Sequence, residues 1–227
     1  MKELIVHNYP KSSVTEAIKA VRTNLRFSSV NENIKTILVT SSISGERKSF
    51  TSANLASTFA TSTEKVLLID CDLRRGRQKD LFGLHGVSKS GLSNLLIDKE
   101  WEKNLEKYIH NTEITNLDLI PTGSTPPNPS MLLESKKLEL IVKELKKKYD
   151  IIIFDAPPVE GLTDALIMTR LADVVLIVAR AKKTTLELLE NTKEALETVN
   201  ANIAGVILNC VDKTDSKYYK NYYYYQS

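Results

Sequence analysis

The sequence lacks the features that mark secreted, disulfide-stabilised or membrane-spanning proteins. Its 227 residues include only two cysteines, Cys71 and Cys210, which is too few for a disulfide framework and fits a reducing cytosol. The start of the chain carries an acidic residue and no long apolar stretch, so we expect no secretory signal. The best apolar run, residues 171–181, is interrupted by Asp173 and Arg180, so any membrane contact must come through a partner.

A strong net charge is also missing. The formal net charge is +3 and no dense basic face accompanies it, so we expect no nucleic-acid binding. The apolar fraction of 42% and the charged fraction of 26% are those of an ordinary globular protein. The length suits one sizeable α/β domain, and nothing in the sequence indicates a second one.

The most informative absence is that of two glycines in the segment 35–49, whose only glycine is Gly45. This segment predicts a buried strand, a loop of small residues, and a helix opened by Lys48 and Ser49, which is the layout of a phosphate-binding P-loop. The usual pattern G-x-x-x-x-G-K-[ST] has Ser42 at its first glycine and Arg47 at its second. Arginine adds bulk and restricts φ where glycine would turn tightly beside phosphate. An ordinary strand-to-helix turn therefore remains the alternative interpretation.

Aspartates end two other predicted strands. The apolar run 65–70 leads into Asp70 and Asp72, and the run 149–155 ends in Asp155. Both runs are typical of parallel strands buried on both faces. Because parallel strands bring their carboxyl ends to one edge of a sheet, these carboxylates are expected near the P-loop.

This set of side chains suits phosphoryl transfer. Mg²⁺ prefers oxygen ligands, and Ser49, Asp72 and Asp155 are the candidates to hold it. Asp70 is the candidate base that takes a proton from an attacking hydroxyl, and Lys48 is the candidate that reaches the outer phosphates.

Strands and helices alternate along the chain. This order predicts a single P-loop NTPase domain over residues 1–213, with a mainly parallel central sheet flanked by helices on both faces. Residues 1–11 are expected to form an extended arm. Residues 214–227 are expected to form a flexible tail.

A charged helix is predicted near the amino terminus. Ser13 to Glu16 form a capping box, and apolar residues at helical spacing continue the helix over residues 15–27, within a segment of about 13–30. Glu16, Lys19 and Arg22 share its other face. Such a stripe is either simply solvated or docks on a neighbouring subunit.

The tail differs in composition from the rest of the chain. It holds six of the nine tyrosines among basic residues and has no aliphatic core residues. These tyrosines are Tyr218, Tyr219, Tyr222, Tyr223, Tyr224 and Tyr225. A stacking surface for nucleic acid is a weak alternative interpretation of the cluster.

Together these motifs resemble the bacterial tyrosine kinases of capsule and exopolysaccharide operons, in the form of the cytoplasmic kinase of the split Gram-positive type. The resemblance covers nearly the whole chain. Besides the charged helix, the P-loop and the tail, it rests on the segments 67–74, 126–130, 151–158 and 205–209. The P-loop and acidic motifs are shared with ATPases of septum placement and plasmid partition, whereas the charged helix and the tail separate the kinases from them.

The resemblance implies an ATP- and Mg²⁺-dependent kinase that phosphorylates its own tail in trans within a ring of subunits. It implies the catalytic residues Lys48, Asp70 and Asp72, the metal residues Ser49, Asp72 and Asp155, and the ring contacts Glu16, Lys19 and Arg22. The expected nucleotide-binding residues are Ser44, Gly45, Glu46, Arg47, Lys48, Ser49, Phe50 and Asn209.

The resemblance also implies partners and a location. The cytosolic segment of a membrane-anchored protein would activate the kinase at the inner face of the plasma membrane, and the cycle would regulate polysaccharide assembly. A cognate tyrosine phosphatase and protein substrates belong to the same expectation.

Three residues depart from the family pattern. Lys19 replaces an arginine of the helix motif and loses its planar fork, Gly76 stands where proline is common, and Arg47 replaces the P-loop glycine. Two alternatives therefore stay open. One is a catalytically impaired scaffold, favoured by Arg47; the other is a partition-type ATPase, opposed by the tyrosine tail.

Overall fold

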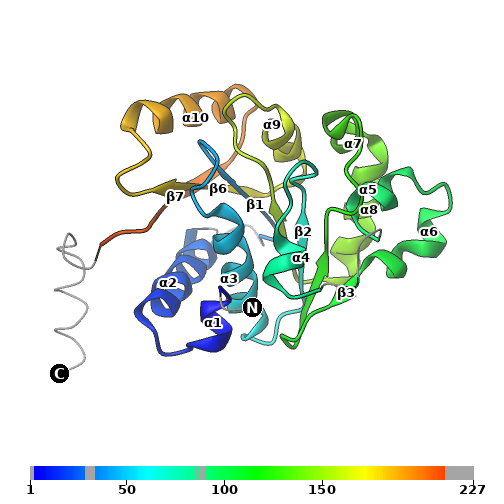
Figure 1. The fold of residues 1–227 in the computed structure, drawn as a ribbon, viewed down its shortest axis with the longest axis horizontal. Helices are drawn as coiled ribbons and strands as arrows, with labels where there is room; N and C mark the ends of the chain where they lie inside the picture. The colour runs from blue at the N-terminus through cyan, green and yellow to red at the C-terminus, as the bar shows by residue number, and fades with distance from the viewer. Residues whose placement is uncertain (1–2, 29–33, 85, 87–89, 213–227) are drawn as a thin grey trace.

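The computed structural model describes residues 3–28, 34–84, 86 and 90–212 (Figure 1). In these residues a seven-stranded sheet has the order β3-β4-β2-β5-β1-β6-β7. Its strands are β1 (Thr36–Ser41), β2 (Val66–Asp70), β3 (His110–Asn111), β4 (Leu117–Ile120), β5 (Ile151–Asp155), β6 (Val174–Arg180) and β7 (Ile203–Asn209).

All neighbouring strands pair in parallel except β3, which runs antiparallel to β4 at the sheet edge. The register sets Asp70 of β2 beside Asp155 of β5, and Val39 of β1 on the other side of Asp155. The carboxyl ends of the central strands therefore meet at one edge, as the sequence predicts.

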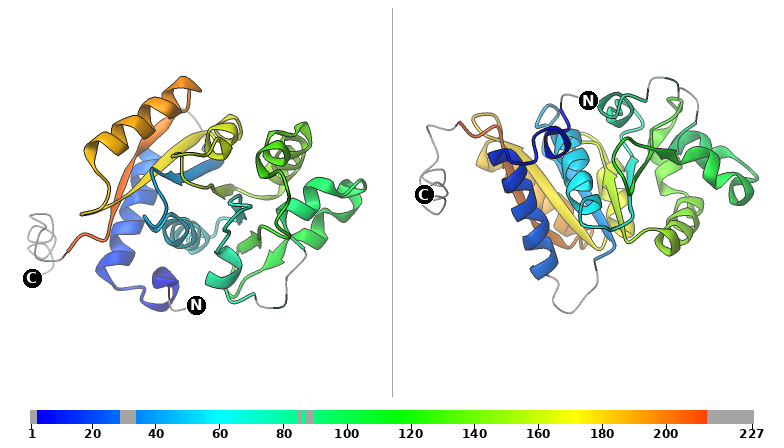
Figure 2. Two further views of the ribbon diagram at one scale, coloured as in Figure 1. Left: turned by 45° about the horizontal axis from the view of Figure 1, so that its top comes forward. Right: turned by 90° about the horizontal axis from the view of Figure 1, so that it is seen from below.

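Helices cover both faces of the sheet (Figures 1 and 2). One face carries α1 (Ile5–Asn8), α2 (Ser13–Ser28), α3 (Lys48–Ala60) and α4 (Gln78–Leu81). The other carries α5 (Leu92–Ile97), α6 (Trp101–Asn104), η1 (Leu105–Tyr108), α7 (Pro129–Glu134), α8 (Lys136–Lys148), α9 (Asp164–Met168), η2 (Thr169–Leu171) and α10 (Leu186–Thr198). The predicted fold class is confirmed.

The apolar strand runs follow from these two helical layers. In β1, Ile37 and Val39 pack toward α3, while Leu38 packs toward the opposite layer, and all three are fully buried. Successive side chains of a strand point to opposite faces, so a strand covered on both sides must be apolar throughout.

Helix α3 is buried almost all round although it is rich in Ser and Thr. Its hydroxyl groups donate hydrogen bonds to backbone carbonyls one turn earlier in the same helix: Ser57 Oγ donates to Ala53 O at 2.8 Å, and Thr58 Oγ1 donates to Asn54 O at 2.8 Å. Small residues whose polar groups are bonded to the preceding turn let this helix lie close to the sheet.

The amino-terminal segment corrects two predictions. The arm predicted as extended contains α1, because Val6 N donates to Asn54 Oδ1 at 3.0 Å and Leu4 is buried against the α3 layer. Helix α2 is capped by Ser12, whose Oγ accepts from Thr15 N at 3.1 Å, one residue earlier than the predicted cap at Ser13. The first correction comes from tertiary packing, which a local pattern does not contain, whereas the second is a shift of one residue within the same local capping motif.

None of the helices in the described ranges is long and apolar enough to cross a membrane. The predicted tail tyrosines lie outside the described residues.

Candidate active site

The P-loop connects β1 to α3 at the edge where the strand ends meet. Two cations, one at the end of β6 and one just after it, hold the backbone of the P-loop: Arg180 Nη1 donates to Gly45 O at 3.3 Å, and Lys183 Nζ donates to Ser44 O at 2.6 Å. Gly45 has φ +85°, a conformation that strains other residues. The loop is therefore shaped from outside as well as by its own sequence.

Glu46 braces the loop from within. Its side chain is buried, Oε2 accepts from Ile43 N at 2.9 Å, and Oε1 is bonded to the Thr184 hydroxyl. Asn209 Nδ2, at the end of β7, donates to Glu46 O at 3.3 Å and to Thr51 Oγ1 at 2.8 Å. Both Glu46 and Asn209 were predicted to bind nucleotide, and here both bond to the protein itself.

Arg47 adopts the left-handed conformation that its glycine-like position requires, with φ 64° and ψ 30°. Its side chain is exposed, and its guanidinium carbon lies 5.6 Å from the centroid of the Phe50 ring. The substitution therefore strains the backbone but leaves the side chain outside the ion-pair cluster of Lys48.

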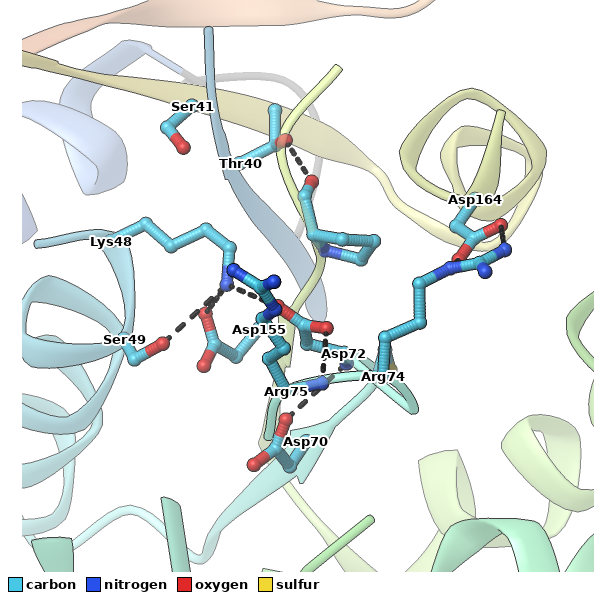
Figure 3. Close-up of polar contacts among 12 residues, drawn as sticks. Thr40, Ser41, Lys48, Ser49, Asp70, Asp72, Arg74, Arg75, Asp155 and Asp164 are labelled. Carbon is cyan, nitrogen blue, oxygen red and sulfur yellow. Dashed lines mark hydrogen bonds and ion pairs between the residues drawn. The ribbon is translucent and has the colours of Figure 1, made fainter. Parts of the chain in front are cut away.

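Lys48 is the centre of the polar cluster (Figure 3). Its Nζ lies 3.3 Å from Asp155 Oδ1, 3.4 Å from Asp72 Oδ2 and 3.4 Å from Ser49 Oγ. Burial alone would lower the pKa of Lys48, but the carboxylates of Asp155, Asp72 and Asp70 outweigh it and raise that pKa. The structure thus brings the predicted strand-end residues together around one ammonium group.

Asp70 is fully buried and bonded to backbone on both oxygens. Oδ1 accepts from Asp72 N at 3.3 Å and Oδ2 from Gln78 N at 2.9 Å. Burial, reinforced by the nearby charge of Asp155, raises the pKa of Asp70 to about 8. Asp70 therefore has the basicity of a proton acceptor, but its oxygens face the protein interior.

Gln78 is a site residue that the sequence patterns did not identify. Its buried Nε2 donates to Asp155 Oδ2 at 2.7 Å and to Ser49 O at 3.0 Å. One side chain therefore connects the aspartate at the end of β5 to the first turn of α3. It lies at the start of the short helix α4, where no motif spacing marks it. Its burial beside two acidic strand ends is visible only in the fold.

Gly76 allows a close approach in the loop between β2 and α4, residues 71–77, here called the acidic loop. A Cβ built there would lie 2.0 Å from Thr122 Cγ2 and 2.7 Å from Asp70 Oδ2. The glycine, in place of the proline common in the family, therefore lets the backbone of this loop lie close to Thr122 and Asp70.

Arg74 ties the acidic loop to the opposite helical layer (Figure 3). Its Nε donates to Asp164 Oδ2 at 3.1 Å and its Nη2 to Ser130 Oγ at 3.2 Å, and Ser130 Oγ donates to Asp164 Oδ1 at 2.5 Å. Ser130 ends the proline-rich segment 126–130, so this segment supports the loop that carries Asp72.

A cavity of about 180 Å³ opens beside Lys48. Seven of the predicted nucleotide-binding residues line it: Ser44, Gly45, Glu46, Arg47, Lys48, Ser49 and Phe50. Asp72 lines it too, whereas Asp70, Asp155 and Asn209 do not.

The donor set around Lys48 fits Mg²⁺ shared with phosphate. Ser49, Asp72 and Asp155 offer one hydroxyl and two carboxylates around Lys48. Across the part of the chain that the structure describes, no group of three or more His, Cys, Asp or Glu could hold a metal without help. Mg²⁺ commonly uses one or two carboxylates and completes its octahedron with water and phosphate oxygens.

The predicted ring contacts lie on α2, away from the cavity. Lys19 Nζ and Glu16 Oε1 form an ion pair at 2.7 Å. Arg22 Nη1 instead donates to Thr58 O at 2.8 Å and also contacts Ser62, so Arg22 joins α2 to the end of α3.

Comparison with known proteins identifies the family. Residues 34–207 match the family model described as AAA domain. The tyrosine-protein kinase YwqD of Bacillus subtilis is 37% identical over 92% of this chain and 86% of its own length.

Solved kinase domains have the same fold. The kinase domain of the Escherichia coli tyrosine kinase Etk superposes with a TM-score of 0.88 at 34% identity, over 95% of this chain and 83% of that one. The chimerical protein CapA2B2 gives a TM-score of 0.86 at 32% identity, over 94% and 92%.

The septum site-determining protein MinD of Pyrococcus horikoshii is only 24% identical, with a TM-score of 0.66 over 80% of this chain and 72% of that one, and this likeness shows the fold alone. The partition-type alternative therefore gains no support. Since the kinase relatives match nearly end to end, the chain belongs to the bacterial tyrosine-protein kinases of capsule and exopolysaccharide biosynthesis.

Proposed function

We propose that this protein-tyrosine kinase transfers the γ-phosphoryl group of ATP, in the presence of Mg²⁺, to the tyrosines of its own tail. The observation that carries the proposal is the position of Lys48 at the cavity, within 3.4 Å of Asp72, Asp155 and Ser49. This is the set of groups that phosphoryl transfer requires.

The charges of the site suggest how nucleotide enters. Lys48 is paired with Asp72 and Asp155 in this structure. Phosphate oxygens would draw its ammonium group away from these carboxylates, which would then be free, with the Ser49 hydroxyl, to hold Mg²⁺. The bound ion would neutralise charge on the transferred group.

Asp70 and Asp72 are proposed to take the proton of the attacking tyrosine. The two differ in access: Asp72 lines the cavity, whereas Asp70, with its pKa raised by burial, is the stronger base but is enclosed. Transfer through Asp70 would require the loop around Gly76 to shift, and transfer through Asp72 would not.

The tail, the assembly and the location complete the proposal. We propose that each tail is phosphorylated by a neighbouring subunit of a ring formed through α2, with Glu16, Lys19 and Arg22 at the contact. A membrane-anchored activator would hold the kinase at the inner face of the plasma membrane, and a tyrosine phosphatase would reset it. The solved relative CapA2B2 is a chimerical protein, which supports a second component.

Arg47 is the one feature that favours the alternative, a catalytically impaired scaffold. Its outward position beside Phe50 favours the active enzyme instead, because the path to Lys48 is left open.

The test is mass spectrometry of the tail after incubation with ATP, Mg²⁺ and the activating segment. We expect phosphate on Tyr218 to Tyr225 in the wild-type chain and none in Lys48→Met. A tail that stays unmodified in the wild-type chain and gains phosphate in Arg47→Gly would support the scaffold.

A further inference from the structure

Three arginines line the active-site cavity without an ion-pair partner in the described part of the chain. Arg47, Arg75 and Arg77, here called the arginine rim, all line the cavity and are all exposed. Within the described ranges none of the three guanidinium groups has an ion-pair partner, whereas their neighbour Arg74 is paired with buried Asp164. The rim therefore presents unneutralised positive charge beside a phosphate site.

The arginine rim is placed to contact the acceptor tyrosine as well as ATP. Arg75 and Arg77 follow Asp72 on the acidic loop and line the same cavity as the P-loop residues. In Figure 3 the Arg75 side chain extends from this loop toward the end of Lys48. A tyrosine whose hydroxyl approaches Asp72 would enter the cavity that these two arginines also line.

The composition of the tail means that the positive charge of the arginine rim distinguishes a phosphorylated tail from an unmodified one. Residues 213–227 contain three lysines and one aspartate, so the unmodified tail is repelled by the rim. Each phosphotyrosine adds a charge of about −1.5 to −2 and three strong acceptor oxygens. Arginine binds such a group through two parallel hydrogen bonds. The first phosphate therefore changes repulsion into attraction.

The spacing of the tyrosines allows one phosphate to guide the next transfer. Tyr222 to Tyr225 are consecutive, and neighbours one or two residues apart lie within about 7 Å along an extended chain. A phosphate held on the rim would thus keep the adjacent tyrosine beside Asp72.

We propose that the arginine rim is a phosphotyrosine-binding site, through which a tail that already carries one phosphate is bound in preference to an unmodified tail. The proposal rests on the proposed tail phosphorylation and adds its order: the first transfer is the slow one, and later transfers on the same tail are favoured.

Peptide binding tests the rim separately from catalysis. The probes are fluorescent peptides of residues 213–227, one unmodified and one with phosphate on Tyr222, titrated with the full chain by anisotropy. Saturating ADP and Mg²⁺ fill the P-loop. We expect the phosphopeptide to bind at least about tenfold more tightly, and this ratio to fall to about one in Arg75→Ala/Arg77→Ala.

Two further variants complete the test. Lys136→Ala/Lys143→Ala removes the same charge from the distant helix α8 and should keep the ratio. Arg75→Lys/Arg77→Lys keeps the charge but loses the paired hydrogen bonds, and should give an intermediate ratio.

Three results would overturn the proposal: equal affinity of the two peptides, a preference that survives the double alanine change, or a preference that appears only without ADP, since the phosphate would then lie in the P-loop. Failure of tail phosphorylation itself would show separately, as no transfer from ATP to either peptide.

Discussion

At the scale of single residues, Arg47 combines a side chain that leaves the site open with a backbone that is strained. Its φ of 64° is unfavourable for any residue with a Cβ. The sequence identified the position as anomalous but could not say where the guanidinium points, because that depends on the Phe50 ring one helical turn away.

Two variants of Arg47 separate the backbone from the side chain. Arg47→Gly should be more stable than Arg47→Ala by about 1 kcal/mol, because both lose the Phe50 contact and only glycine relieves the left-handed conformation. Denaturant unfolding measures the difference. Equal unfolding free energies would show that the loop is not strained at this residue.

The buried carboxylate Asp70 should make stability depend on pH. Its pKa is raised to about 8, so the folded state holds the proton more tightly than the unfolded state does. The proton on Asp70 therefore stabilises the folded state fully at pH values below the unfolded pKa of about 4. This stabilisation decreases as the pH rises above that value and is lost once the pH has passed through about 8.

Without metal or nucleotide, the wild-type chain should lose stability between about pH 4 and about pH 8, with a slope of up to about 1.4 kcal/mol per pH unit for this proton, and level off above about pH 8. Asp70→Asn should remove that component. Urea unfolding of both chains over this range gives the comparison, and parallel curves would contradict the shifted pKa.

At the scale of elements, the strand ends were predictable and the connections between them were not. Parallel pairing alone places Asp70 beside Asp155, so the acidic cluster follows from the strand pattern. Gln78 and the bond from Arg74 to Asp164 depend on how loops and short helices pack, and their residues are far apart in sequence. Periodicity carries no information about such contacts.

The ion pair of Arg74 and Asp164 is expected to stabilise the acidic loop. Asp164 is fully buried and Arg74 is 38% exposed, so Arg74→Ala leaves an unpaired buried charge. We expect a loss of about 2 kcal/mol, below the value for a fully buried pair because water still reaches the arginine.

The matched control is Lys103→Ala, which breaks the exposed pair with Glu100. That pair is 79% and 65% exposed and should contribute less than about 0.5 kcal/mol. Denaturant unfolding measures both losses. Equal losses for the two variants would show that the pair of Arg74 and Asp164 does not stabilise the acidic loop.

At the scale of the whole molecule, the charged face of α2 remains the predicted ring contact. Glu16→Ala/Lys19→Ala should lower the oligomer mass in sedimentation velocity while costing the fold less than about 0.5 kcal/mol, since this pair lies at the surface. Arg22→Ala is a less specific test because Arg22 also bonds to α3. An unchanged mass would exclude Glu16 and Lys19 from the contact.

The central claim is that this site phosphorylates a neighbour's tail despite Arg47. The most direct measurement mixes two chains, one active but truncated after residue 213, the other isotopically labelled, full-length and carrying Lys48→Met. After ATP, Mg²⁺ and the activating segment are added, mass spectrometry reads the labelled tail. The account predicts phosphotyrosine on the labelled chain only when the active chain is present. A labelled tail without phosphate, from a mixture in which both chains are folded and the active chain binds ATP, would contradict it.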